Sequence, residues 1–245
     1  MRAVVLLFLA ALTAPLSAAE LNATPAASPI LDPVKEGEAL AAKLRAAAPL
    51  DSSEFNGVLE IDRAGKRQSI PIVSRISVTE TNWRVAYRSL PTNGALAETL
   101  VITHAPDGPS HYELANGTNA AAAVPLTRAF AGSDFWLLDL GLEFFHWPQQ
   151  RALRAEMSRS RPCRVLESAT PQPAPDSYAR VLSWIDNETG GVLQAEAYDA
   201  QGKLLKKFAL GSFQKLEGQW QLRDMRIRNA RTGQQTELKF DLKAK

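Results

Sequence analysis

The sequence carries one long apolar stretch far from its start, Gly132-Ser-Asp-Phe-Trp-Leu-Leu-Asp-Leu-Gly-Leu-Glu-Phe-Phe-His-Trp-Pro148. Nine of the thirteen residues from Phe135 to Trp147 are large and apolar. Ser133 or Asp134 can act as an N-cap, and Pro148 cannot continue a helix, so the stretch predicts a helix of about three to four turns. Such a helix is apolar nearly all round and needs cover on more than one side. It is too short to cross a bilayer, which takes roughly 20 apolar residues.

Two interpretations of this helix are open, and they overlap. It is either a helix of the hydrophobic core or a lid over an apolar cavity. As a lid, it would offer its large apolar side chains to a ligand. The predicted ligand-binding residues are Phe135, Trp136, Leu138, Leu142, Phe144, Phe145 and Trp147.

The first residues are typical of a secretory signal peptide. Arg2 precedes an apolar run from Ala3 to Leu12, and small residues occupy the last and third-last positions before a cleavage site after Ala19. No cysteine lies near that site to carry a lipid anchor. We therefore expect a signal peptide over residues 1–19, a flexible leader over 20–33 and a single domain over 34–245, exported in soluble form to the periplasm.

Composition argues against several classes of function. Cleavage would remove Arg2, leaving 27 Lys and Arg against 26 Asp and Glu, too even a balance for a nucleic-acid partner. The three histidines and one cysteine show no metal-ligand spacing, and no nucleophile motif occurs. Asp134 and Asp139 are interpreted as a cap and a solvated face, and Cys163 as a small buried hydrophobe. We expect no enzyme, metal or cofactor.

The rest of the sequence predicts a curved antiparallel sheet. An amphipathic helix is expected from Pro33 to Ala48, with Asp32 as its N-cap, and a short helix-like piece from Gln149 to Ser158. Short alternating runs separated by turn residues leave no room for crossover helices. The predicted strands cover 55–62, 69–78, 82–88, 98–104, 111–114, 163–169, 178–186, 192–199, 203–213, 220–229 and 235–242. The expected fold is mainly β (α+β): an unclosed antiparallel barrel of about ten to eleven strands with helices covering its concave side.

An ordered set of short motifs resembles bacterial outer-membrane lipoprotein-sorting proteins, the LolA-like group. The set comprises Ser133-Asp-Phe135 with Asp139, Cys163-Arg-Val-Leu-Glu167, Tyr178 with Trp184-Ile-Asp186, Ala195-Glu-Ala-Tyr-Asp199, Gly202-Lys-Leu204 with Lys206, Gly218 with Trp220, Met225 and Asn229, and Thr236-Glu-Leu238. The resemblance implies an unclosed β-barrel with a helical lid, holding acyl chains in an apolar cavity. Arg84 in Trp83-Arg-Val-Ala-Tyr87 is similar to an arginine that holds the lid in that group, which makes Arg84 a possible lid latch.

Two functions follow as hypotheses. The first is a monomeric periplasmic carrier that shields acyl chains of lipoproteins or lipids during outer-membrane sorting, with membrane-bound donor or acceptor proteins as possible partners. The second is a lipid- or lipoprotein-sensing regulatory module on the same scaffold. A hydrolase whose site forms only in three dimensions is a third and weaker alternative.

Overall fold

Fifteen strands and three short helical pieces follow α1 in the described part of the chain. The computed structural model describes residues 30–49, 51–91, 94–104, 108–117, 119–121, 124–216 and 219–242. The elements are α1 (Pro33–Ala46), β1 (Ser53–Arg63), β2 (Lys66–Val78), β3 (Trp83–Ser89), β4 (Glu98–His104), β5 (His111–Asn116), β6 (Asn119–Ala121), η1 (Phe130–Gly132), α2 (Leu137–Gly141), η2 (Glu143–His146), β7 (Gln149–Ser158), β8 (Arg161–Ala169), β9 (Arg180–Asp186), β10 (Val192–Tyr198), β11 (Leu204–Leu210), β12 (Phe213–Leu216), β13 (Gln219–Leu222), β14 (Asp224–Asn229) and β15 (Gln235–Asp241).

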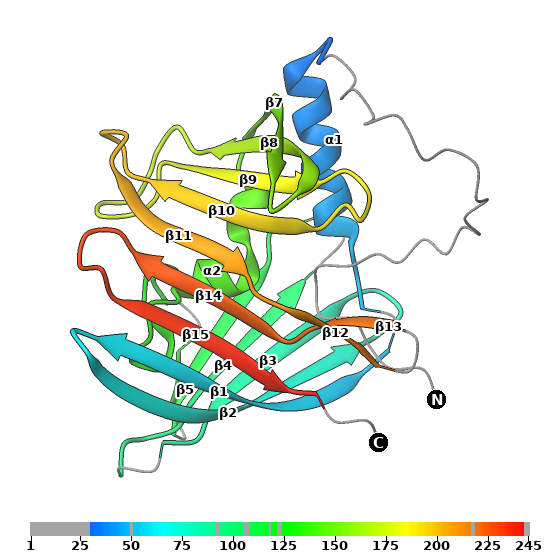
Figure 1. Cartoon of the computed structure of the whole chain (residues 1–245). Helices are drawn as coiled ribbons and strands as arrows, with labels where there is room; N and C mark the ends of the chain where they lie inside the picture. Colours follow the sequence, from blue (N-terminus) through cyan, green and yellow to red (C-terminus); the bar gives the residue numbers. More distant parts are fainter. Residues whose placement is uncertain are drawn as a thin grey trace.

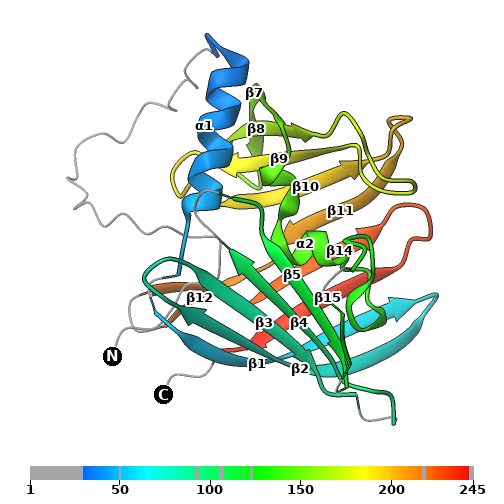
Figure 2. The same ribbon diagram turned by 180° about the vertical axis from the view of Figure 1, so that it is seen from behind.

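Thirteen of these strands form one antiparallel sheet, in the order β6-β5-β4-β3-β2-β1-β15-β14-β11-β10-β9-β8-β7. The sheet curls around α2 without closing, as Figures 1 and 2 show from opposite sides. The remaining strands, β12 and β13, pair as a separate hairpin between β11 and β14. The predicted unclosed antiparallel barrel is confirmed. Its thirteen strands exceed the ten or eleven expected, because β6 and β7 were not predicted as strands. The runs 203–213 and 220–229 each break into two strands, which adds the separate hairpin of β12 and β13.

The residues Gln149–Ser158 form a strand, so the expected helix-like piece is wrong. β7 pairs along its length with β8, with a bulge between Ala152 and Arg154. Its residues are compatible with a helix on propensity alone. Pairing with β8 supplies a full ladder of backbone hydrogen bonds, and tertiary context of this kind overrides a weak local preference.

Alternation along the strands places the core on the concave side of the sheet. In β15, Thr236, Leu238 and Phe240 are buried, while their neighbours along the strand are partly exposed or exposed. Residues two apart along a strand share a face, so this pattern gives the sheet one dry face and one wet face. The main apolar cluster gathers these inward side chains together with those of α2 and η2.

Helix α1 begins as the sequence predicts. The Asp32 carboxylate accepts a hydrogen bond from the Lys35 backbone N–H at 3.0 Å, and Pro33 occupies the first helical position. Gly37 packs directly on β7, where a Cβ atom would lie 2.5 Å from the Arg151 backbone. Glu36 forms an ion pair of 2.6 Å with Arg164 of β8. The helix is thereby fixed to the β7 edge of the barrel, where Figure 1 shows it in blue.

The segment Phe130–Trp147, called the central segment below, is not the single helix that the apolar run predicts. It contains one five-residue α-helix, α2, flanked by the 3-10 turns η1 and η2. Leu142 interrupts the helix with a left-handed backbone (φ 52°), and Ala131 does the same in η1 (φ 48°). Ser133 and Asp134 precede α2 by several residues and are not its N-cap. An apolar run without clear periodicity fits several short turns as well as one helix, and burial on all sides stabilises the turns.

The central segment joins the two edges of the open sheet. The chain reaches one edge at β6, crosses the concave side through η1, α2 and η2, and resumes at the opposite edge with β7. Figure 2 shows α2 between the two halves of the sheet. The crossing therefore lies over the interior of the barrel, where a lid would have to lie.

The predicted signal peptide and most of the leader lie outside the described residues, as does most of the turn after His104. Within the part that is described, no helix combines the length and the apolarity needed to span a membrane.

Cys163 is completely buried in a second apolar cluster with Val165 and Trp184, as expected of a small hydrophobe.

Candidate ligand-binding site

Lys206 on β11 is a buried cation at the centre of the concave side, with only 4% of its surface exposed. Its Nζ donates to the backbone carbonyl of Asp134 at 2.7 Å and to Oδ2 of Asp139 at 3.2 Å. It also lies 3.7 Å from the ring centroid of Trp136. Burial lowers the pKa of Lys206, and the Asp139 carboxylate opposes that shift. Apart from the Tyr178 ring, whose centroid is 5.6 Å from Nζ, these partners of the lysine belong to the central segment.

Asp139 is buried within this cluster, so its interpretation as part of a solvated face is wrong. Its Oδ2 accepts a hydrogen bond from the Trp136 backbone N–H at 2.8 Å, which caps the start of α2. Its Oδ1 accepts from the Tyr178 hydroxyl at 2.9 Å. Burial, and next the Asp139 charge, raise the pKa of Tyr178 well above its ordinary value, so Tyr178 stays a donor. One carboxylate therefore binds a lysine, a tyrosine and a backbone amide.

Asp134 is also buried, and its predicted cap role is wrong as well. Its Oδ2 accepts from the hydroxyl of Thr236 on β15 at 2.8 Å, and the Asp134 backbone N–H donates to that same hydroxyl oxygen at 2.9 Å. Thr236 is completely buried. This pair attaches the start of the central segment to the middle of the sheet.

Two pairs of aromatic rings complete the contact between the central segment and the barrel. Trp136 stacks on Tyr178, with centroids 4.7 Å apart and planes 21° from parallel. Phe135 meets Phe208 of β11 edge-on, with centroids 6.4 Å apart. Offset stacking and edge-on packing are the favourable geometries for aromatic pairs.

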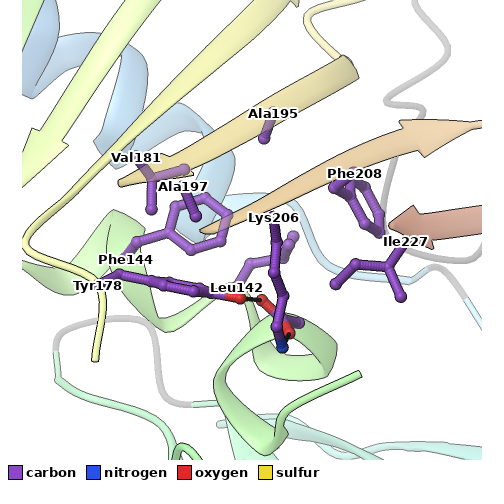
Figure 3. A pocket seen from close by; sticks show the side chains of 10 residues that line it. Leu142, Phe144, Tyr178, Val181, Ala195, Ala197, Lys206, Phe208 and Ile227 are labelled. Carbon is purple, nitrogen blue, oxygen red and sulfur yellow. Dashed lines mark hydrogen bonds and ion pairs between the residues drawn. The ribbon is translucent and has the colours of Figure 1, made fainter. Parts of the chain in front are cut away.

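Beside Lys206 lies a small apolar cavity between the central segment and strands β9, β10, β11 and β14 (Figure 3). About 20 Å³ is open to the centre of a water molecule, room for roughly one water. Figure 3 shows Lys206 and Tyr178 pointing toward the helical turn of the central segment. The walls are formed by Leu142, Phe144, Val181, Ala195, Ala197, Phe208 and Ile227, with Asp139, Tyr178 and Lys206 at the polar end. An acyl chain fits here only after the central segment has moved.

The structure places the predicted ligand-binding residues in four different environments. Leu142 and Phe144 line the cavity. Phe135, Leu138 and Phe145 are almost fully buried members of the core, and Trp136 covers Lys206. Trp147 instead lines an open groove beside α1, together with Arg45, His146 and Gln150. Only part of the predicted surface thus faces the cavity, in the closed arrangement that the structure has.

Arg84 does not contact the central segment. It lies on the exposed face of β3, whereas Trp83, Val85 and Tyr87 alternate with it and point into the core. Arg84 is thus not on the buried face of β3, and its latch role stays a prediction. The cation that contacts the central segment here is Lys206, which lies on β11 and not on β3. The sequence carried a signal for it, since Lys206 is two residues from the buried Phe208 and therefore shares its face.

A second polar group lies under η2. The Tyr112 hydroxyl donates to Oε2 of Glu143 at 3.0 Å. Nearby, Ser110 Oγ lies 3.0 Å from Nδ1 of His104 and 3.5 Å from Nε2 of His146. Burial raises the pKa of Glu143 to about 7, against the lowering effect of the Tyr112 hydrogen bond. Burial lowers the pKa of His104 to about 4.

The free energy of unfolding is expected to fall as the pH rises through 7, because of Glu143. A carboxyl group whose pKa is raised on folding stabilises the protein fully below its unfolded pKa, and that stability is lost as the pH rises through the folded value. Between pH 6 and 8.5 the loss should be about 1–2 kcal/mol, measured by urea denaturation. His104 and His146 act at lower pH, because the pKa of each is lowered.

Glu143→Gln should flatten this dependence, since the amide oxygen still accepts from Tyr112 but does not ionise. Glu113→Gln is the matched control, because Glu113 is an exposed carboxylate on the same strand as Tyr112. An unchanged slope in Glu143→Gln would exclude Glu143 as the titrating group.

Among the described residues, no group of three or more His, Cys, Asp or Glu is arranged to hold a metal ion. The buried polar groups of the site instead bind one another.

Comparison with solved structures defines the class of fold. A putative outer membrane lipoprotein-sorting protein domain from Vibrio parahaemolyticus is similar with a TM-score of 0.71 and 19% identity, over 85% of this chain and 92% of that one. A DUF1329 family protein from Desulfovibrio piger has a TM-score of 0.70 and 19% identity, over 86% and 92%. A LolA superfamily protein from Nitrosomonas europaea has a TM-score of 0.60 and 18% identity, over 87% and 94%. The chain has the unclosed-barrel fold of the LolA superfamily.

The sequence model of a family described as "Uncharacterized protein"-like matches residues 118–243, and the chain belongs to that family. No curated protein matches the sequence.

Proposed function

We propose that this protein is a periplasmic carrier that shields the acyl chains of lipoproteins or lipids, with the central segment acting as its lid. The observation that carries the proposal is the apolar cavity between that segment and the sheet. Two of its walls, Ala195 and Ala197 on β10, are small residues facing inward where larger ones would fill the space. Residues of the segment itself, Leu142 and Phe144, close the cavity.

The energetics of acyl binding are compatible with such a site. Burial of apolar surface is worth about 0.8 kcal/mol per CH2 group, so a 16-carbon chain gains on the order of 10 kcal/mol before ordering costs. This gain has to offset the movement of a segment whose side chains are well packed. Binding and release would then be governed by how firmly the segment is attached to the sheet.

The lipoprotein-sorting name of the Vibrio parahaemolyticus domain supports this function by fold alone. A periplasmic carrier has to be exported, and the predicted signal peptide would direct that export. It has to bind its ligand and needs no catalytic group. The sensing module remains the alternative prediction. Pull-down of a partner protein with no co-purifying lipid would favour it.

Filling the cavity tests the proposal. Ala197→Leu adds three carbons to the cavity wall beside Lys206 and so fills the cavity. The variant is expected to bind acyl ligands at least tenfold more weakly. Ala209→Leu is the matched control, since Ala209 is a partly exposed residue of β11 that does not line the cavity. Displacement of an apolar fluorescent dye by a fatty acid measures the affinity, and lipid extraction with mass spectrometry identifies what co-purifies. Equal affinity in both variants, or no acyl binding by the unmodified protein, would contradict the function.

A further inference from the structure

The donors that surround the Asp139 carboxylate belong largely to the barrel and not to the central segment. Lys206 comes from β11, and Tyr178 lies two residues before the start of β9. Together they contact both oxygens of the carboxylate, Nζ at 3.2 Å from Oδ2 and the hydroxyl at 2.9 Å from Oδ1. The barrel thus presents a cation and a hydroxyl donor arranged for one carboxylate.

The anion in this site comes from the central segment. Asp139, the Asp134 carbonyl and the Trp136 ring contact Lys206 and all lie between η1 and the end of α2, whereas the more distant Tyr178 ring, at 5.6 Å, belongs to the barrel side. The side chains that the sheet contributes to the cavity wall are apolar: Val181, Ala195, Ala197, Phe208 and Ile227. Among the residues lining the cavity, Asp139 carries the only negative charge.

Movement of the central segment would therefore leave a buried cation beside an apolar cavity. An unpaired charge in such surroundings is strongly unfavourable unless it gains a partner or loses its proton. The opened barrel needs an anion at this position, and a neutral acyl chain does not supply one.

We propose that Lys206 and Tyr178 form a binding site for the anionic group, carboxylate or phosphate, of an acyl ligand, which replaces Asp139 when the central segment moves. This inference rests on the proposed function and names its ligand class. The acyl chain extends from the site along Ala195 and Ala197, and the anionic group takes over the two contacts that Asp139 makes with Lys206 and Tyr178. Asp139 then acts as an internal competitor that keeps the site occupied without ligand.

The inference is tested on the unmodified protein by comparing its affinities for ligands that have the same chain length and different head groups. Dodecanoate, dodecyl phosphate, methyl dodecanoate and dodecylamine are titrated at pH 7.5, with displacement of an apolar dye as the signal. We expect at least one of the two anions to bind ten times or more tightly than the ester, and the amine to bind most weakly. The tighter of the two anions identifies the source, a free fatty acid or a phosphate-bearing lipid.

Equal binding of the anions and the ester would overturn the inference and leave the acyl-binding function standing. Absence of binding by all four would remove the function itself, and the inference with it.

Variants then assign the preference to the two residues. Asp139→Asn removes the competing charge, so dodecanoate should bind several-fold more tightly while methyl dodecanoate changes less than twofold. Adding Lys206→Met to that variant should abolish the preference for the anion and keep the affinity for the ester. Lys207→Met is the control, because Lys207 is exposed on the opposite face and pairs with Glu196 at 2.7 Å. Circular dichroism establishes that each variant is folded, and the ligand series on the unmodified protein decides the question if one is not. An anion preference that survives Lys206→Met would overturn the assignment.

Discussion

Lys206→Met is expected to lower the free energy of unfolding by about 3–5 kcal/mol, the usual cost of removing one partner from a buried ion pair. Methionine fits the space of the lysine stem, so little packing is lost. Asp139 keeps the Tyr178 hydroxyl and the Trp136 amide as donors, but loses the cation that compensates its charge. The loss also removes the contact over the Trp136 ring and the hydrogen bond to the Asp134 carbonyl.

A double-mutant cycle distinguishes this pair from an ordinary packing effect. Asp139→Asn added to Lys206→Met should recover part of the lost stability, because no charge then remains buried and unpaired. Lys207→Met should change the free energy of unfolding by less than about 1 kcal/mol, since its ion pair is exposed. Urea denaturation followed by circular dichroism measures the unmodified protein, the two single variants, the double variant and the Lys207→Met control. Additive effects in the cycle would mean that the two side chains do not stabilise each other.

Replacing Leu138 and Phe145 together by aspartate should prevent folding altogether. The two side chains are only 3% and 2% exposed in the structure, and each belongs to the main apolar cluster. A buried unpaired carboxylate costs several kcal/mol. The combined cost of two is comparable to the whole free energy of unfolding of a typical domain, about 5–15 kcal/mol. The expected far-ultraviolet spectrum at room temperature is that of an unfolded chain.

The matched control is the pair Leu31→Asp and Leu96→Asp, whose leucines are 91% and 65% exposed. That variant should unfold within a few degrees of the unmodified protein. If the Leu138 and Phe145 variant kept its sheet and lost only acyl binding, the central segment would be a detachable cover and not part of the core.

Sequence patterns predicted most of the sheet, because a strand with one buried face alternates apolar and polar residues along its sequence. The alternation in β15 and in β3 marks which side chains are buried, and turn residues mark where each strand ends. The pattern fails at Gln149–Ser158, where the composition fits a helix and only pairing with β8 decides the outcome. It also fails within the apolar run, since a residue such as Leu142 gives no local sign that its backbone is left-handed.

The candidate site was predicted in part, for a physical reason. Apolar residues of the central segment were recognised from their density, and Leu142 and Phe144 do line a cavity. The polar centre was missed because Asp139 and Asp134 look like surface carboxylates unless their partners are known. Those partners, Lys206 and Thr236, lie 67 and 102 residues further along the chain. Only the tertiary fold brings such distant residues together.

The route of the central segment between the two edge strands has a mechanical consequence. A flap with one free end could turn aside alone, but this segment is tethered to β6 at one end and to β7 at the other. Helix α1 is fixed to β7 at Gly37, and its Arg45 donates to the Phe145 carbonyl at 2.6 Å. A force on α1 therefore acts both on the β7 edge of the sheet and on the central segment. We therefore expect the gap between the β6 and β7 edges and the position of the central segment to change together when α1 moves.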